Sequence, residues 1–244
     1  MNEAHRDPAR VHALARELHA ATTRPWTLME VCGGQTHALL RFGVDQLLPP
    51  QIELLHGPGC PVCVTPAQAL DDAIALSRRP DVTLCTFADM LRVPATQGDL
   101  LLARAQGGDV RIVGSPLDAL ALAASQPTRQ VVFLAVGFET TAPITALAVQ
   151  RAAQAGVANF SLLLSHVRVP PALDALCRAP GCRVQGFLAA GHVCTIMGVD
   201  EYASICQQHR VPVVVTGFEP VDLLTGILAC VRQLERGQAQ VENC

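Results

Sequence analysis

The feature that most constrains this chain is a regular alternation between short apolar runs and helix-forming segments. Most runs are continuous rather than alternating, which is typical of strands buried on both faces of a parallel sheet. An α/β fold with largely parallel sheets is therefore predicted. The predicted strands are 26–31, 52–55, 82–86, 110–113, 131–136, 160–164, 184–189 and 213–216.

Helix start signals follow several of these runs. Thr65-Pro66 and Ser115-Pro116 each place an N-cap residue before a proline at the first helical position. Two longer segments consist mostly of good helix formers. The predicted helices are 67–77, 117–124, 141–155 and 222–236.

Two similar lobes fit the eight strands better than one sheet does. Each lobe is predicted to be a mainly parallel four-stranded sheet flanked by helices, with a cleft between the lobes. The polar stretch 126–129 marks the break, and segments 131–139 and 211–219 both read strand, Gly-Phe-Glu, helix. The predicted lobes are 1–126 and 127–236, followed by a tail at 237–244. The last helix packs either within the second lobe or back on the first.

Composition excludes several classes of protein. Half of the residues are hydrophobic, 16% are charged, and the formal net charge is -3, so a packed core is expected and disorder is not. The absence of a dense Arg stripe argues against nucleic-acid binding. No apolar run reaches the roughly 18 residues of a membrane span, and residues 1–7 lack the apolar core of a signal peptide. A cytoplasmic location without membrane association is expected.

The chain has ten cysteines, which a cytosolic protein seldom uses for structural disulfides. The remaining uses are buried thiols, metal ligands and redox thiols. Five cysteines lie in apolar or helical contexts without nearby partner motifs, and we expect them to be small buried hydrophobes. They are Cys85, Cys177, Cys182, Cys206 and Cys230.

Cys32 follows the first predicted strand, where ligands bind in open α/β sheets. Gly33 and Gly34 allow a tight turn and a close approach of backbone to a ligand. Nearby amides are expected to stabilise the Cys32 thiolate. His37, one helical turn further on, is a candidate base or second ligand.

Cys60 and Cys63 form a Cys-x-x-Cys loop ahead of a predicted helix. Such a loop lowers a thiol pKa and lets the pair cycle between dithiol and disulfide. The same spacing chelates metal, although a closed zinc site normally needs a second pair or two histidines. Redox or open metal chemistry is favoured over structural zinc and over inert thiols.

Two further polar segments follow buried strands. Glu139, Thr140 and Thr141 offer acceptors and hydroxyls to a polar ligand. His192 and Cys194 either face a ligand or are a satisfied core histidine and a buried thiol. No phosphate-binding loop, dinucleotide fingerprint or serine-hydrolase elbow is present in the sequence.

Taken in order, five blocks resemble the HypD family of [NiFe]-hydrogenase maturation proteins. The blocks are 30–37, 57–63, 137–141, 191–193 and 216–220. This resemblance implies two α/β lobes facing each other across a cleft, with Cys32 holding the iron of an Fe(CN)2CO unit under assembly. It also implies that Cys60 and Cys63 exchange electrons nearby, and that the partners are a HypC-type chaperone and a HypE-type protein that delivers cyanide.

Members of that family normally continue into a segment whose cysteines bind a [4Fe-4S] cluster, whereas this sequence ends at Cys244. Such a cluster needs about four thiolates, so none is expected in this chain. The main hypothesis is an iron scaffold with redox-active thiols, in which His37 and Glu139 adjust protonation, rather than a classical turnover enzyme. The alternatives are a general dithiol oxidoreductase using Cys60 and Cys63, and an inactive truncated fragment.

Overall fold

The computed structural model describes residues 3–244, apart from the side chain of Glu3, as two α/β units that are discontinuous in sequence. Unit 1 comprises Met1–Cys60 with Arg168–Cys244, and unit 2 comprises Pro61–Val167. All strand pairs in both sheets are parallel, which confirms the predicted fold class. The predicted cleft between the lobes stays a prediction.

Unit 1 is built on a five-stranded sheet of order β2-β1-β7-β8-β9. The strands are β1 (Trp26–Glu30), β2 (Ile52–His56), β7 (Gly186–Ala190), β8 (Val213–Thr216) and β9 (Val241–Asn243). The helices are η1 (Glu3–Arg6), α1 (Pro8–Ala21), α2 (Gly33–Phe42), η2 (Val44–Leu47), α8 (Val169–Arg178), α9 (Gly191–Met197), α10 (Asp200–His209) and α11 (Pro220–Glu235).

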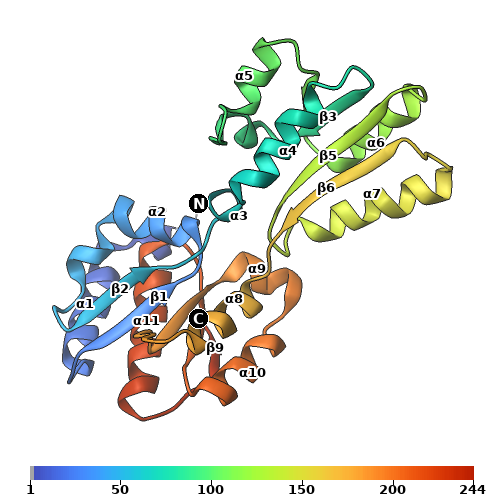
Figure 1. Cartoon of the computed structure of the whole chain (residues 1–244). Coiled ribbons are helices and arrows are strands. Elements are labelled where there is room, and N and C mark those ends of the chain that lie inside the picture. Colours follow the sequence, from blue (N-terminus) through green and yellow to red (C-terminus); the bar gives the residue numbers. More distant parts are fainter. Residues whose placement is uncertain (1–2) are drawn as a thin grey trace. The chain divides into compact units, whose positions relative to one another are not determined.

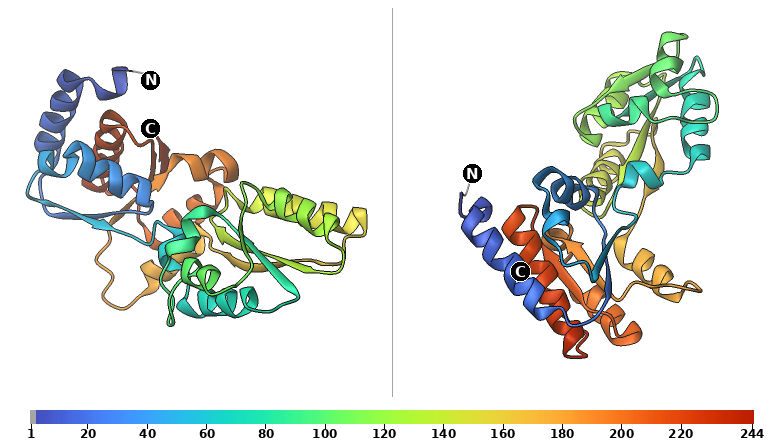
Figure 2. Two further views of the ribbon diagram at one scale, coloured as in Figure 1. Left: turned by 90° about the horizontal axis from the view of Figure 1, so that it is seen from above. Right: turned by 90° about the vertical axis from the view of Figure 1, so that its left-hand side faces the viewer.

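One face of this sheet is covered by α1, α2 and α11. Helices α1 and α11 lie side by side although they come from opposite ends of the chain (Figure 1 and Figure 2). The core between them and the sheet includes Leu18, Leu39, Leu188 and Leu224, all 0% exposed. Helix α11 is nearly all buried because it packs against both α1 and the sheet.

Unit 2 is built on a four-stranded sheet of order β4-β3-β5-β6, covered on both faces. The strands are β3 (Val82–Thr86), β4 (Val110–Ile112), β5 (Gln130–Gly137) and β6 (Phe160–His166). Helices α4 and α5 pack on one face and α6 on the other. The helices are α3 (Pro61–Val64), α4 (Ala67–Ser77), η3 (Ala88–Arg92), α5 (Leu100–Ala105), α6 (Pro116–Ser125) and α7 (Ala142–Ala155).

The eight predicted strands all exist, but the predicted lobe boundary at 126/127 needs correction because it falls inside unit 2. The polar stretch there is a turn, in which the Arg129 amide donates to the Gln126 carbonyl at 3.0 Å. Asn159 Nδ2 lies within hydrogen-bond distance of the carbonyl oxygens of Ala123, Gln126 and Arg129. The chain instead passes between units at 60/61 and 167/168. The predicted tail contributes β9, which makes the sheet of unit 1 five-stranded.

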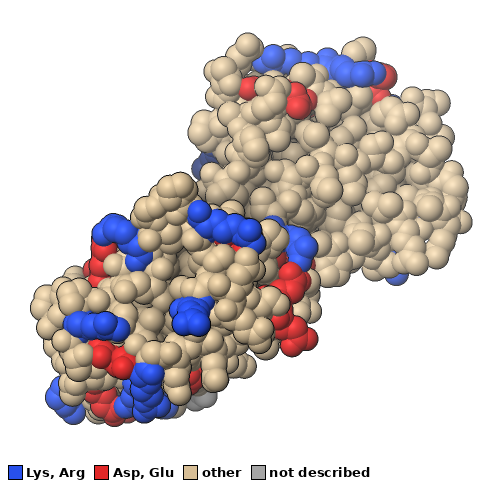
Figure 3. Space-filling model, turned by 60° about the horizontal axis from the view of Figure 1, so that its bottom comes forward, with Lys and Arg blue, Asp and Glu red and all other residues tan. Residues whose placement is uncertain are grey.

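The distribution of surface charge and the length of the helices are relevant to nucleic-acid binding and to membrane association. On the face shown in Figure 3, basic and acidic side chains are interspersed rather than gathered into a basic stripe. Within residues 3–244, none of the helices is both long enough and apolar enough to cross a membrane. The cytoplasmic location stays a prediction.

Candidate functional site

The carboxyl edge of the unit 1 sheet gathers most of the predicted motifs. Cys32 follows β1, Cys60 follows β2, His192 follows β7 and Phe218 follows β8. Because these strands are parallel and adjacent, the turns after them meet at one edge of the sheet, where open α/β sheets bind ligands.

Cys32 is the residue that caps the start of α2, and only 7% of it is exposed. Its side chain belongs to a small apolar cluster with Ala190 and Val193, against which Phe218 packs. The thiol is therefore a covered group in this structure rather than an open one.

The Glu30 carboxylate, which is 0% exposed, fixes the backbone of Cys32. Its Oε2 accepts a hydrogen bond from the Cys32 amide at 2.9 Å. Its Oε1 accepts one from the Thr36 hydroxyl and lies 2.7 Å from His56 Nδ1. A buried carboxylate is tolerated only when it is hydrogen-bonded or paired, and these three groups meet that need while holding three separate segments together.

The role of Glu30 and His56 was missed by sequence reasoning. A signal was present: each is the polar last residue of an apolar strand. The two residues are direct partners in the β1–β2 register. Without knowing that these two strands are neighbours, a charged residue at a strand end is simply expected to meet solvent.

The turn after β2 packs directly on the turn after β1. The Gly33 amide donates to the Gly59 carbonyl at 2.8 Å, and the Gly57 amide donates to the Glu30 carbonyl at 2.8 Å. A Cβ on Gly59 would overlap the backbone N and Cα of Cys32, so only glycine allows this approach. A Cβ on Gly33 would lie 3.5 Å from the Cβ of Cys60. The structure thus brings Cys32 and Cys60 together.

The pKa of Cys32 is raised, which corrects the prediction of a stabilised thiolate. Burial is the largest cause, and hydrogen bonds from the amides of Gly34 and Gln35 oppose it without overcoming it. The charges of Glu30 and Cys60 add to the rise. The expected amides are present, but the apolar surroundings dominate.

Cys63 lies exposed on the four-residue helix α3, at the start of unit 2. Its predicted approach to Cys32 stays a prediction, because the two residues belong to different units. His37 is exposed on α2, and among residues 3–244 no hydrogen bond joins it to Cys32. The predicted role of His37 as a base has no geometric support within unit 1.

Gln35 ties α2 to two strands of the sheet. Its Nε2 donates to the Ala189 carbonyl at 3.2 Å and to Thr216 Oγ1 at 3.0 Å. The residue is fully buried, and its Oε1 accepts no hydrogen bond from the part of the chain that is described. These contacts fix the first turn of α2, which carries Gly33 and Gly34.

His192 stands beside Phe218 at the same edge. The two ring centroids are 5.3 Å apart, with the planes tilted by 40°. Burial against its surroundings lowers the pKa of His192. His192 therefore neighbours Phe218, which in turn packs against the cluster that contains Cys32.

Glu139, Thr140 and Thr141 belong to unit 2 and lie after β5. Thr141 Oγ1 is 2.9 Å from Nε2 of His166, the last residue of β6. A Cβ on Gly137 would overlap that hydroxyl, so the glycine makes room for the pair. Burial lowers the pKa of His166, a residue that the sequence did not single out. Glu139 is 5% exposed.

The remaining cysteines largely match the expected buried hydrophobes. Cys85, Cys206 and Cys230 are buried, Cys177 is half-buried, and Cys182 is exposed, which corrects that one prediction. Burial raises the pKa of Cys85 and of Cys177 to about 11. Among the described residues, no three His, Cys, Asp or Glu side chains form a metal-binding group, whereas a closed zinc site needs four ligands.

Comparisons with known proteins identify relatives of the whole chain. Residues 9–244 match the HypD family model, described as "Hydrogenase formation hypA family". The "Hydrogenase maturation factor HypD" of Azotobacter vinelandii is 49% identical over 246 residues, which cover 98% of this chain and 65% of the relative. The corresponding protein of Rhodobacter capsulatus is 47% identical over 235 residues, covering 96% and 62%. That of Escherichia coli (strain K12) is 48% identical over 234 residues, covering 95% and 63%.

The chain therefore spans slightly less than two thirds of the length of these relatives. Among solved structures, a sugar transporter from Clostridium phytofermentans covers 90% of this chain at 10% identity, with a TM-score of 0.21. That likeness is too low to bear on fold or function.

Proposed function

Because this chain belongs to the HypD family of hydrogenase formation proteins, we propose that it holds iron at Cys32 during hydrogenase maturation. The iron is cargo: it belongs to the Fe(CN)2CO unit under assembly. Thiolate sulfur is a soft ligand that suits low-spin iron carrying strong-field diatomic ligands. A second thiolate is supplied by a small HypC-type chaperone, and a HypE-type protein delivers cyanide.

The observation that carries this proposal is the anchoring of Cys32 by the buried Glu30 carboxylate, with Cys60 packed alongside. A scaffold needs its ligand atom in one place before and after the cargo binds, and a fixed backbone provides that. The apolar cluster around the thiol excludes water, which protects a reactive centre.

Cys60 and Cys63 have the redox role in this proposal. The pair changes between dithiol and disulfide while the ligands are installed, and each oxidation of the dithiol releases two electrons and two protons. Glu139, which belongs to unit 2, and His37, which is exposed on α2, are proposed to adjust protonation.

The experiment is iron retention in the complex with a HypC-type partner. Cys32→Ala is expected to reduce bound iron to less than about a tenth of the parent level, because a soft ligand is lost. Cys85→Ala, which removes a buried thiol of unit 2, is the matched control and should keep its iron. Full iron stoichiometry in Cys32→Ala would refute the assignment, and loss of partner binding by the parent chain would favour the inactive fragment.

A general dithiol oxidoreductase remains a second candidate, because Cys63 is exposed and Cys60 is partly so. This function predicts turnover with small disulfides that persists in Cys32→Ala and disappears in Cys60→Ser. For an iron scaffold, by contrast, bound iron is lost in Cys32→Ala and persists in Cys60→Ser.

A further inference from the structure

The Cys32 thiol is covered in this structure. Only 7% of the residue is exposed, and its cluster consists of Ala190, Val193 and the neighbouring Phe218. A metal centre delivered by another protein must reach the sulfur atom from solvent. Some part of the cover must therefore move when the cargo binds.

Phe218 is the member of this cover that faces solvent. Ala190 and Val193 are each 3% exposed and belong to β7 and α9, whereas Phe218 is half-buried and lies on the turn between β8 and α11. A Cβ placed on Gly34 would lie 3.0 Å from Phe218 Cε1 and 3.5 Å from Cys32 Sγ. The ring edge and the sulfur therefore border the same small space above Gly34.

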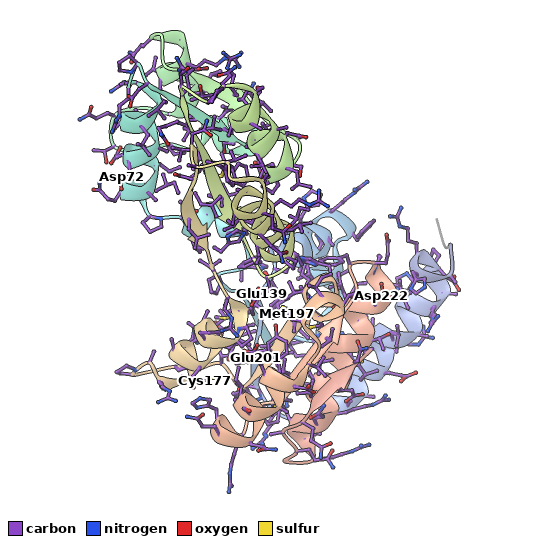
Figure 4. All side chains as sticks on the ribbon, turned by 90° about the vertical axis from the view of Figure 1, so that its right-hand side faces the viewer. Asp72, Glu139, Cys177, Met197, Glu201 and Asp222 are labelled. Carbon is purple, nitrogen blue, oxygen red and sulfur yellow. The ribbon has the colours of Figure 1, made fainter. Side chains whose placement is uncertain are left out.

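The turn that carries Phe218 is tied to the N-terminal segment. Arg6 donates two hydrogen bonds to the carboxylate of Glu219, one from Nε to Oε2 and one from Nη2 to Oε1 at 2.7 Å. His5 Nδ1 lies 2.6 Å from Oδ1 of Asp222, which is labelled in Figure 4 at the start of α11. The Arg6 guanidinium also lies over the Phe42 ring, 5.2 Å from its centroid.

These contacts hold the turn beside the Phe218 ring in place. Glu219 is the residue directly after Phe218, and the Asp222 carboxylate also accepts a hydrogen bond from the Glu219 amide at 3.3 Å. Arg6 and His5 therefore hold the backbone next to the ring from a segment more than 200 residues away in sequence. The Arg6–Glu219 pair is partly exposed on both sides, so it is weak enough to break and reform.

We propose that Phe218 is the gate residue that controls access to the Cys32 thiol, and that the Arg6–Glu219 pair is the latch that keeps the gate closed. The inference rests on the proposed function, in which Cys32 receives iron. When the gate is closed, the ring keeps water and stray metal from the sulfur. When the latch opens, the ring moves away with its turn and the sulfur becomes accessible to an incoming metal.

The test is site-resolved alkylation of Cys32 by iodoacetamide in the full chain without iron, followed by mass spectrometry. Because thiol reactivity follows exposure, Phe218→Ala is expected to raise the Cys32 rate by about tenfold. Arg6→Ala is expected to raise it about two- to fivefold, which is the shift that loss of one exposed ion pair produces.

The matched control is Arg232→Ala. Arg232 pairs with Glu17 at 2.9 Å and also joins the N-terminal region to α11, but it does not touch the Phe218 turn. Its Cys32 rate should equal that of the parent. Cys230, which is 0% exposed on α11, monitors unfolding of unit 1 and should stay unreactive in all variants.

An unchanged Cys32 rate in Phe218→Ala, with Cys230 still protected, would overturn the gate. If Cys230 reacts in Phe218→Ala, the surface variant Arg6→Ala decides: an unchanged Cys32 rate there overturns the latch, and a faster one supports it. Because the assay contains no iron, it separates this inference from the proposed function. A gated thiol that never retains iron would refute the scaffold and leave the gate standing.

Discussion

The Nδ1 atom of His56 lies 2.7 Å from Oε1 of Glu30, at the point where β2 and β1 end side by side. This contact closes a network in which the other oxygen of the same carboxylate accepts the Cys32 amide. The position of the candidate iron ligand is thus set by a buried carboxylate, two residues earlier in the chain, that never needs to touch the cargo.

Glu30→Gln is expected to destabilise unit 1 by about 1–3 kcal/mol, because an amide cannot accept from all the donors that the carboxylate satisfies. Trp26 is the chain's single tryptophan and lies in β1, so its fluorescence during urea unfolding reports on this unit alone. Glu53→Gln on the neighbouring strand is the comparison: its exposed carboxylate accepts from the Thr27 hydroxyl and pairs with Arg183, and because exposed pairs contribute little, this variant should lower the midpoint less than Glu30→Gln does. Equal midpoints for the two variants would contradict the anchoring role.

Gly59→Ala is expected to lower the same unfolding midpoint clearly, because the added methyl would overlap the Cys32 backbone. Gly33→Ala is the matched comparison at the facing turn. There the methyl would meet the nearest atoms at 3.5 and 3.7 Å, which is ordinary contact. A Gly59→Ala variant as stable as Gly33→Ala would show that the two turns are not packed as described.

Unit 1 is expected to lose stability in acid because the folded protein stabilises the ionised form of Glu235. Its carboxylate accepts from the Thr23 amide and hydroxyl and from Trp26 Nε1, and these bonds lower the pKa of Glu235 from 4.5 to about 2. A lowered folded-state pKa means that the contribution is complete above pH 4.5 and is lost as pH falls towards 2. Urea midpoints between pH 6 and pH 2.5 should therefore fall less steeply in Glu235→Gln than in the parent.

His166 in unit 2 should titrate below an ordinary histidine. Burial beside Thr141 lowers the pKa of His166, because the charged form loses hydration. As a result, folding of unit 2 loses stability when pH falls below the unfolded value of 6.5, since the unfolded state binds the proton more readily. Proton NMR titration of the imidazole, assigned with His166→Gln, checks this; a midpoint at or above 6.5 would contradict it.

The strands were predictable because burial on both faces leaves continuous apolar runs, such as 131–136, that survive without knowledge of the fold. Strand β9 was not predictable: Val241–Asn243 is short and largely polar, and it exists because it extends the sheet beside β8. The unit boundary depends on pairing between distant strands, such as Leu28 with Gly186, which no local pattern reveals.

The site, like the fold, could be predicted only in part. Cys32 was found because a cysteine and a histidine accompany the glycine pair after a strand, and Cys60 was found from the Cys-x-x-Cys spacing. The parallel sheet then brings the two cysteines together. Glu30 and His56 were not found, since their meaning depends on the register of β1 and β2. The sign of the Cys32 pKa shift depends on the cluster of Ala190, Val193 and Phe218, which comes from the far end of the sequence.

The proposal that Cys32 holds the iron is tested most directly by infrared spectroscopy of the complex co-purified with a HypC-type partner, with parent and Cys32→Ala prepared in parallel. The parent complex is expected to show cyanide and carbonyl stretching bands together with bound iron, and Cys32→Ala is expected to bind the partner without those bands. The same bands at full intensity in Cys32→Ala would show that Cys32 does not hold the iron.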